Sequence, residues 1–200
     1  MRTAYRLLAT IVFGLAVSLA QAEWNSERLR NPVMFNDQLI PYPVFAVYVM
    51  PGARLRVGLV DATGGATATF AGRELDLGRD DLRAPETPGL AVLEIRNTAT
   101  GERSTLNVLV MVPASSVDRD GRLNSYRIGS YPSEPLRGLD IYLPPKGFVE
   151  VTADNAGTRI SPNFTLGQFV AKQAGGYPKY LLLDERLLIK LELILEAINA

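Results

Sequence analysis

The sequence predicts a mainly β fold, an immunoglobulin-like β-sandwich followed by a short α-helical segment. Three observations support this prediction. Short stretches with a two-residue hydrophobic period follow one another between residues 44 and 112. Turn residues, such as Pro51-Gly52, separate these stretches. Beyond Thr152 the hydrophobic period lengthens to that of an amphipathic helix.

Five strands are predicted, at residues 44–49, 54–59, 66–70, 90–95 and 104–112. The second and third (RLRVGL and ATATF) alternate polar and apolar residues, which is typical of strands with one buried face. Five strands are fewer than a full sandwich needs, and residues 124–128 and 148–151 could add two.

The last forty residues predict a short helix and then a long amphipathic one. Thr165 is a candidate N-cap for the short helix and Asp184 for the long one. In the long helix the large apolar side chains fall on one stripe, formed by Leu187, Leu188, Leu191, Ile194, Leu195 and Ile198. Such a stripe predicts packing against another body, because soluble monomers avoid exposing patches of this kind.

The N-terminus has the pattern of a signal peptide. Arg2 and Arg6 give a positive start, residues 7–19 are apolar, and Ala20-Gln21-Ala22 matches the small-x-small cleavage pattern. We therefore expect cleavage after Ala22 and export to a bacterial periplasm. The alternative is an uncleaved N-terminal membrane anchor, although the apolar stretch is short for a membrane span.

These patterns divide the chain into five parts. Residues 1–22 are the signal peptide and 23–43 a polar, Pro-punctuated lead. Residues 44–129 form the β-sandwich, with 152 as an alternative end. A Pro-rich connector covers 130–160, and 161–200 are the opening helices of a further, truncated domain.

Composition argues against catalysis by this chain. The sequence has no His and no Cys, which removes the Ser-His and Cys-His nucleophile systems and all metal sites built on those ligands. The formal net charge is zero, with 21 basic and 21 acidic residues and no run of either sign, so no nucleic-acid partner is expected. We predict no catalytic, cofactor-binding or metal-binding residue.

Two acidic stretches invite a functional interpretation and have a structural alternative. Asp118 to Gly121 (DRDG) contains part of a calcium loop, but the twelfth position, Gly129, lacks the required glutamate. A β-turn in which Asp side chains bind the backbone is the favoured interpretation. The paired carboxylates Asp80 and Asp81 point apart in a loop, and a solvated charged surface is expected there.

Several ordered stretches resemble exported bacterial proteins of the D-alanyl-D-alanine carboxypeptidase-like zinc peptidase family. They are residues 121–132 (GRLNSYRIGSYP), 147–151 (GFVEV) and, most specifically, 161–169 (SPNFTLGQF) with 177–181 (YPKYL) and the leucine-rich helix. The resemblance implies a peptidoglycan peptidase whose zinc is held by His, Asp and His beyond that helix. Position 163 is often His in similar sequences and is Asn here, so it is not counted as a ligand.

Two functions are therefore expected. In the first, the chain is the N-terminal part of such a periplasmic peptidase and is inactive alone. Zinc then belongs to the full-length protein, and the missing peptidase domain packs on the helical stripe. In the second, the chain is a complete, non-catalytic periplasmic binding or adaptor protein, with peptidoglycan or a periplasmic protein as its partner.

Overall fold

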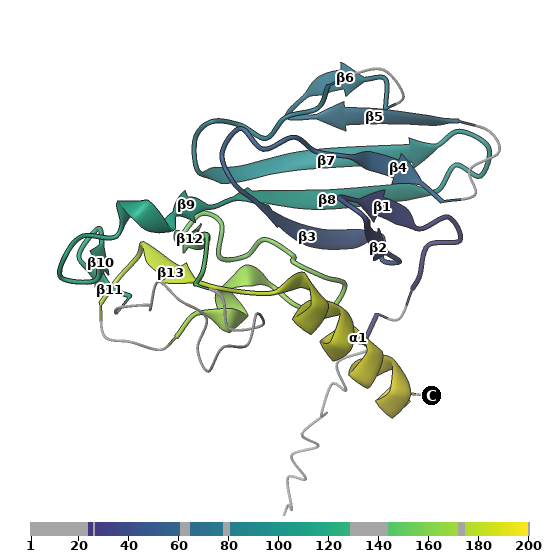
Figure 1. The fold of residues 1–200 in the computed structure, drawn as a ribbon. Coiled ribbons are helices and arrows are strands. Elements are labelled where there is room, and N and C mark those ends of the chain that lie inside the picture. Colours follow the sequence, from purple (N-terminus) through teal and green to yellow (C-terminus); the bar gives the residue numbers. More distant parts are fainter. Residues whose placement is uncertain are drawn as a thin grey trace, which may run out of the picture.

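Two β-sheets face each other across one hydrophobic core (Figure 1). The computed structural model describes residues 24–25, 27–60, 65–77, 81–128, 144–171 and 175–199. The predicted signal peptide and residues 130–143 of the predicted connector lie outside these ranges. The predicted fold class, a β-sandwich followed by a short helical segment, is confirmed.

The larger sheet has five strands in the order β3–β8–β7–β5–β6. β3 runs parallel to β8, and the other neighbouring pairs are antiparallel. The bounds are β3 Val44–Val49, β5 Ala66–Phe70, β6 Arg73–Leu75, β7 Gly89–Asn97 and β8 Arg103–Val110. β3 and β5 have the predicted bounds. β5 alternates polar and apolar residues, whereas β3 is an apolar run that the turn signal Pro51-Gly52 closes.

The smaller sheet covers one face of the larger one and has the order β2–β1–β4. Its strands are β1 Val33–Phe35, β2 Gln38–Ile40 and β4 Val57–Leu59. β1 and β2 form a hairpin whose turn residues, Asn36 and Asp37, have positive φ angles of 45° and 70°. The expected polar lead thus contributes two strands, and the predicted strand 54–59 is shortened to its last three residues.

The core lies between these two sheets. The central strands of the larger sheet send residues two positions apart inward, such as Leu93 and Ile95 from β7 and Leu106 and Val108 from β8. Val33 of the smaller sheet closes the core and is completely buried. Burial of each such side chain contributes about 1.5–3 kcal/mol.

A second, smaller cluster lies beyond one end of the sandwich, at the left of Figure 1. It contains Leu123, Phe148 and Tyr180. Its elements are β9 Val112–Pro113, η1 Ala114–Ser116, β10 Arg122–Leu123, β11 Tyr126–Arg127, β12 Gly147–Val151 and β13 Lys179–Leu181. The predicted strand at 148–151 lies within β12, whereas residues 124–125 form the turn between β10 and β11.

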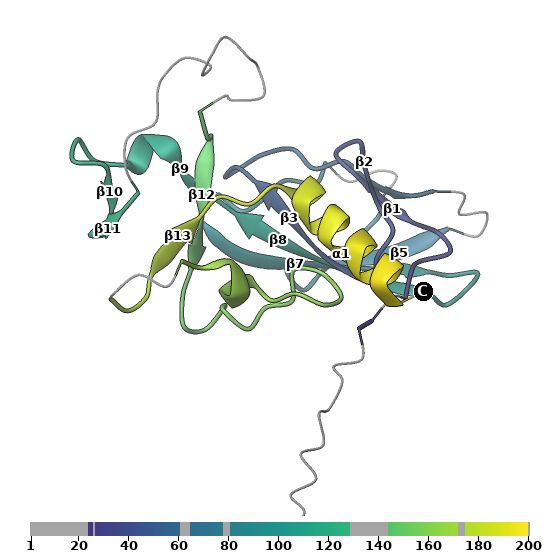
Figure 2. The ribbon, with the colours of Figure 1, turned by 90° about the horizontal axis from the view of Figure 1, so that it is seen from below.

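The C-terminal part contains one α-helix, not two, within the described residues. The predicted short helix is a single 3-10 turn, η4 Leu166–Phe169, in which the Thr165 N–H donates to Gln168 Oε1 at 2.7 Å. The long helix is α1, Glu185–Asn199. Asp184 is its N-cap, because the Asp184 Oδ1 accepts from the backbone N–H of Arg186 at 2.8 Å. Figure 2 shows α1 lying along the underside of the sandwich, next to β3.

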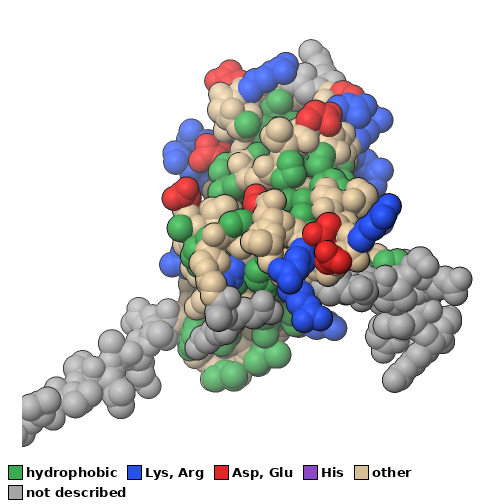
Figure 3. Space-filling view, turned by 90° about the vertical axis from the view of Figure 1, so that its left-hand side faces the viewer, with side chains coloured by type: hydrophobic (Ala, Val, Ile, Leu, Met, Phe, Trp, Pro, Cys, Tyr) green, Lys and Arg blue, Asp and Glu red, His purple; other side chains and the backbone are tan. Residues whose placement is uncertain are grey.

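The surface seen in Figure 3 carries both signs of charge. Lys and Arg side chains lie next to Asp and Glu side chains, with hydrophobic and other polar groups between them. This face therefore has mixed polarity and no extended area of one charge.

Candidate functional site: the two faces of the C-terminal helix

α1 contacts the β-sandwich through a row of glutamates. Glu192 and Glu196 follow Glu185 by seven and eleven residues. These spacings place all three on one face of a helix with 3.6 residues per turn. Leu188, completely buried, lies beside them. The helix thus docks by a mostly acidic face and a single fully buried leucine.

Glu185 accepts a hydrogen bond from β3, the edge strand of the larger sheet. Its Oε1 accepts from the backbone N–H of Tyr48 in β3 at 2.9 Å. The next outward N–H of the same strand, that of Ala46, donates to the carbonyl of Ile160 at 2.8 Å. Burial raises the pKa of the Glu185 carboxyl above its ordinary value.

Glu192 is buried, with 1% of its surface exposed, and is surrounded by neutral donors. Its Oε1 accepts from the Ser161 hydroxyl at 2.5 Å and from the backbone N–H of Asn163 at 2.9 Å. Its Oε2 accepts from the Asn163 side-chain amide at 2.6 Å. Three hydrogen bonds replace the water lost on burial and tie α1 to the loop before η4.

Asn163 extends this connection to the N-terminal lead. Its side chain accepts from the backbone N–H of Asn25 and donates to the backbone carbonyl of the same residue, both at 2.7 Å. Asn163 is therefore a structural connector between the lead and α1. The metal-ligand type to which Asn163 hydrogen-bonds among the described residues is the carboxylate of Glu192.

Glu196 makes a second connection between α1 and the N-terminal lead. Arg28 donates to both of its oxygens, one of them from Nε at 2.9 Å, and the Tyr42 hydroxyl donates at 3.2 Å. The hydrogen bonds from Arg28 hold the pKa of the Glu196 carboxyl below its ordinary value. Burial, followed by the neighbouring Glu196 charge, raises the pKa of Tyr42 to about 12.

The opposite face of α1 carries the apolar stripe, and most of it faces outward. Leu187, Ile194 and Ile198 are 44%, 55% and 70% exposed, and Leu191 between them is half-buried. Spacings of four, seven and eleven residues align these four side chains, which we call the outer stripe. Of the six side chains predicted to pack on a missing domain, Leu188 packs on the β-sandwich, and Leu195 is half-buried.

The outer stripe offers packing and no chemistry. Its four side chains carry no nucleophile, base or metal ligand, while the glutamates of α1 point the other way and are hydrogen-bonded. Exposed apolar rows on a helix are the usual signature of a helix-in-groove or domain–domain contact. The arrangement is an exposed apolar row on a helix that is itself held to the sandwich.

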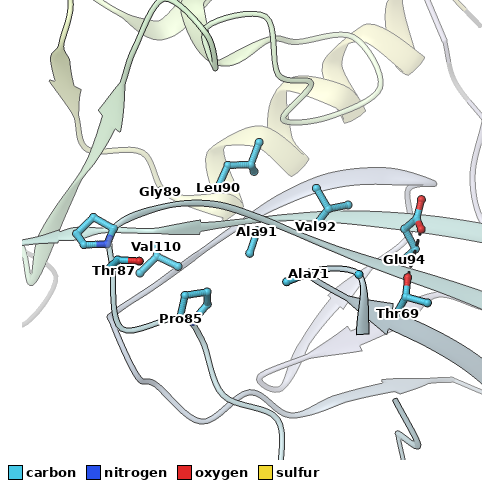
Figure 4. Close-up of a pocket in the computed structure, with 12 residues that line it drawn as sticks. Thr69, Ala71, Pro85, Thr87, Gly89, Leu90, Ala91, Val92, Glu94 and Val110 are labelled. Carbon is cyan, nitrogen blue, oxygen red and sulfur yellow. Dashed lines mark hydrogen bonds between the residues drawn. The ribbon is translucent and has the colours of Figure 1, made fainter. Parts of the chain in front are cut away.

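A shallow depression of about 470 Å³ lies where β7 extends past the end of β5 (Figure 4). Leu90 and Val92 of β7 line it together with Pro85 and Ala71. Its single carboxylate, Glu94, accepts a hydrogen bond from the Thr69 hydroxyl at 3.2 Å. The lining residues hold no pair of nucleophile and base.

Asp118 and Asp81, one from each of the two acidic stretches, have structural roles. Asp118 Oδ1 accepts from the backbone N–H groups of Asp120 and Arg122 at 2.9 and 2.8 Å, which confirms the predicted β-turn. Asp81 pairs with Arg54 and Arg83 on the surface, and Asp80 lies outside the described residues.

No group of three or more His, Cys, Asp or Glu side chains that could hold a metal ion occurs among the described residues. In the part of the chain that the structure describes, no helix is both long and apolar enough to cross a membrane.

Fold and site together define the class as a mainly β sandwich protein with a docked C-terminal helix. Comparison with family models, with curated proteins and with solved structures finds no match.

Proposed function

We propose that this chain is the non-catalytic accessory part of an exported peptidoglycan-processing zinc peptidase, and that a peptidase domain packs on the outer stripe of α1. The observation that carries the proposal is the orientation of α1, which binds the sandwich by its glutamates and turns Leu187, Ile194 and Ile198 outward. A docked helix with an outward apolar row is suited to join two bodies rigidly.

The resemblance of residues 161–169 and 177–181 to the zinc peptidase family supports the identity of the second body. In this proposal the zinc ligands belong to that body, and the sandwich positions it against the cell wall. We expect the present chain to bind no zinc stoichiometrically and to cleave no muropeptide.

The test is to translate the reading frame beyond codon 200. The proposal expects His and Asp residues with zinc-ligand spacing after the leucine-rich helix. A stop codon directly after Ala200 would overturn it. Purified chain that binds zinc or cleaves muropeptides would contradict the non-catalytic role.

A second candidate function is a complete periplasmic adaptor, favoured by the three separate connections of α1 to the rest of the chain, at Tyr48, Asn163 and Arg28. A helix held in this way needs no further domain to keep its place. In that case the outer stripe takes a separate periplasmic protein, and a stop codon after Ala200 would agree with it.

Both candidates include export. The charged start, apolar stretch and Ala20-Gln21-Ala22 pattern support cleavage after Ala22. Sequencing the N-terminus of the exported protein tests this: Glu23 is the expected first residue, and retention of Met1 would favour the anchored alternative.

A further inference from the structure

Trp24 lies at an open depression next to the docked helix. The depression has a volume of about 330 Å³ and is lined by the N-terminal lead, the start of β3 and the loop before η4. Trp24 is the only tryptophan of the chain and is 43% exposed. The lining side chains used below are Trp24, Pro43, Arg159, Pro162 and Asn163.

The walls of the depression are held in place. Asn163 clamps both backbone polar groups of Asn25, the residue that follows Trp24. On the other wall, the Asn107 side chain of β8 donates to the Arg159 carbonyl at 2.7 Å. The Arg159 guanidinium also donates to the carbonyl of Pro162. A pre-formed site loses less entropy on binding a ligand.

The chemistry of the lining combines an aromatic plane with one cation. An exposed indole offers a flat apolar face with a polar N–H at its edge, and Pro43 and Pro162 add apolar contact. Arg159 is exposed, and none of the described lining residues is acidic, so a carboxylate can approach without repulsion from the walls. Guanidinium groups recognise carboxylates through paired hydrogen bonds.

We infer that this depression binds a saccharide that carries a carboxylate. One apolar face of the sugar ring stacks on Trp24, and the carboxylate pairs with Arg159. The depression is shallow and open, which suits a ring with an apolar face and a polar rim better than a buried aliphatic side chain. The saccharide class rests on this depression alone, whereas choosing a cell-wall amino sugar as the probe rests on the proposed function.

The test uses the emission of Trp24, which no other tryptophan obscures. The purified full chain is titrated with N-acetylmuramic acid and, separately, with N-acetylglucosamine, which has the same ring without the lactyl carboxylate. We expect a saturable change of Trp24 emission with the first sugar and an affinity about tenfold lower for the second, the loss expected for one charge-assisted contact.

Two variants complete the test. Arg159→Gln should lower the affinity for N-acetylmuramic acid about tenfold, while Arg54→Gln, an exposed arginine elsewhere, should leave it unchanged. Thermal unfolding of both variants confirms that the fold is kept. Calorimetry on Trp24→Ala, whose side chain lies outside the core, should show loss of binding.

Three results would overturn the inference. They are no saturable change up to the solubility limit of the sugar, equal affinity for both sugars, and unchanged affinity in Arg159→Gln. None depends on the outer stripe, since the two surfaces share no residue. A stop codon after Ala200 together with sugar binding would reject the proposed function and keep the saccharide site.

Discussion

Glu185 and Glu196 share one face of α1, yet their surroundings shift their pKa values in opposite directions. Burial raises the pKa of Glu185, and the hydrogen bonds from Arg28 lower that of Glu196. A carboxyl with a lowered pKa contributes stability above its unfolded-state pKa and loses it as the pH falls through the folded-state value. A carboxyl with a raised pKa loses its contribution as the pH rises through the folded-state value.

These shifts give a matched pair of variants. At pH 7, Glu196→Gln should lower the free energy of unfolding by about 0.5–1 kcal/mol, since the Arg28 side chain is half exposed and screened. The difference from the native protein should shrink as the pH falls below the ordinary carboxyl value of 4.5. Urea unfolding between pH 7 and 3 measures it.

Glu185→Gln should behave in the opposite way. The amide oxygen can still accept from Tyr48, and no charge is then buried, so stability at pH 7 should stay equal or rise by up to about 1 kcal/mol. The same urea titrations apply. A loss larger than that of Glu196→Gln would contradict the assigned cause of the raised pKa.

Glu192 is the residue most sensitive to a conservative change. In Glu192→Gln one carboxylate oxygen becomes an NH₂ group facing the donors of Ser161 or Asn163, so at least one buried group loses its partner. We expect a loss of about 1–3 kcal/mol of unfolding free energy. The exposed Lys190→Gln is the control and should change stability by less than about 0.5 kcal/mol. Equal effects would show that the three hydrogen bonds do not hold α1.

At the scale of the helix, the buried and the exposed apolar side chains are different residues. Leu188 packs on the sandwich, whereas Ile194 and Ile198 face outward. The double variant Ile194→Lys, Ile198→Lys should keep the native unfolding free energy within about 0.5 kcal/mol, because both side chains are more than half exposed. It should also lose binding to a hydrophobic dye and to any body that packs on the outer stripe.

Leu188→Ala is the counterpart of that variant. Leu188 is completely buried against the sandwich, so its truncation should cost about 2–5 kcal/mol. The double lysine variant should thus unfold like the native protein in denaturant, and Leu188→Ala at lower denaturant. The reverse order would mean that the outer stripe, and not the glutamate face, holds α1 to the domain.

The elements themselves were predictable to different degrees. Residues 66–70 alternate polar and apolar side chains, and residues 44–49 form an apolar run before the turn signal Pro51-Gly52, so the bounds of both strands follow from the sequence. β1 and β2 have three residues each, too few for a period, although Asn36-Asp37 is a turn signal that could have indicated the hairpin.

The docking of α1 was not predictable. Apolar periodicity shows that a helix has an apolar face, but not that its glutamates would find donors at Tyr48, Ser161 and Asn163. These contacts join residues 29 to 137 positions apart in the chain, and no local pattern encodes them.

At the scale of the whole molecule, two apolar clusters should differ in stability. The smaller one depends on Tyr180, whose hydroxyl donates to Glu150 and accepts from Asn124, both at 2.6 Å. Burial raises the pKa of Tyr180 to about 12. The larger cluster is built on the five-stranded sheet, and β12 and β13 contribute residues to both clusters.

Tyr180→Phe removes both hydrogen bonds and should cost about 1–2 kcal/mol. Hydrogen exchange should then speed up in β10–β13, while β7 and β8 keep their protection. An equal loss of protection in all strands would show that the two clusters unfold as one unit.

The position of β3 at the margin of the larger sheet has one further consequence. Its outward N–H groups at Ala46 and Tyr48 are occupied by Ile160 and by the Glu185 side chain, so the chain's own C-terminal part caps a strand edge. Uncapped edges recruit strands from other molecules and begin aggregation. Glu185 therefore blocks pairing of the β3 edge with a strand of another molecule, in addition to positioning the helix.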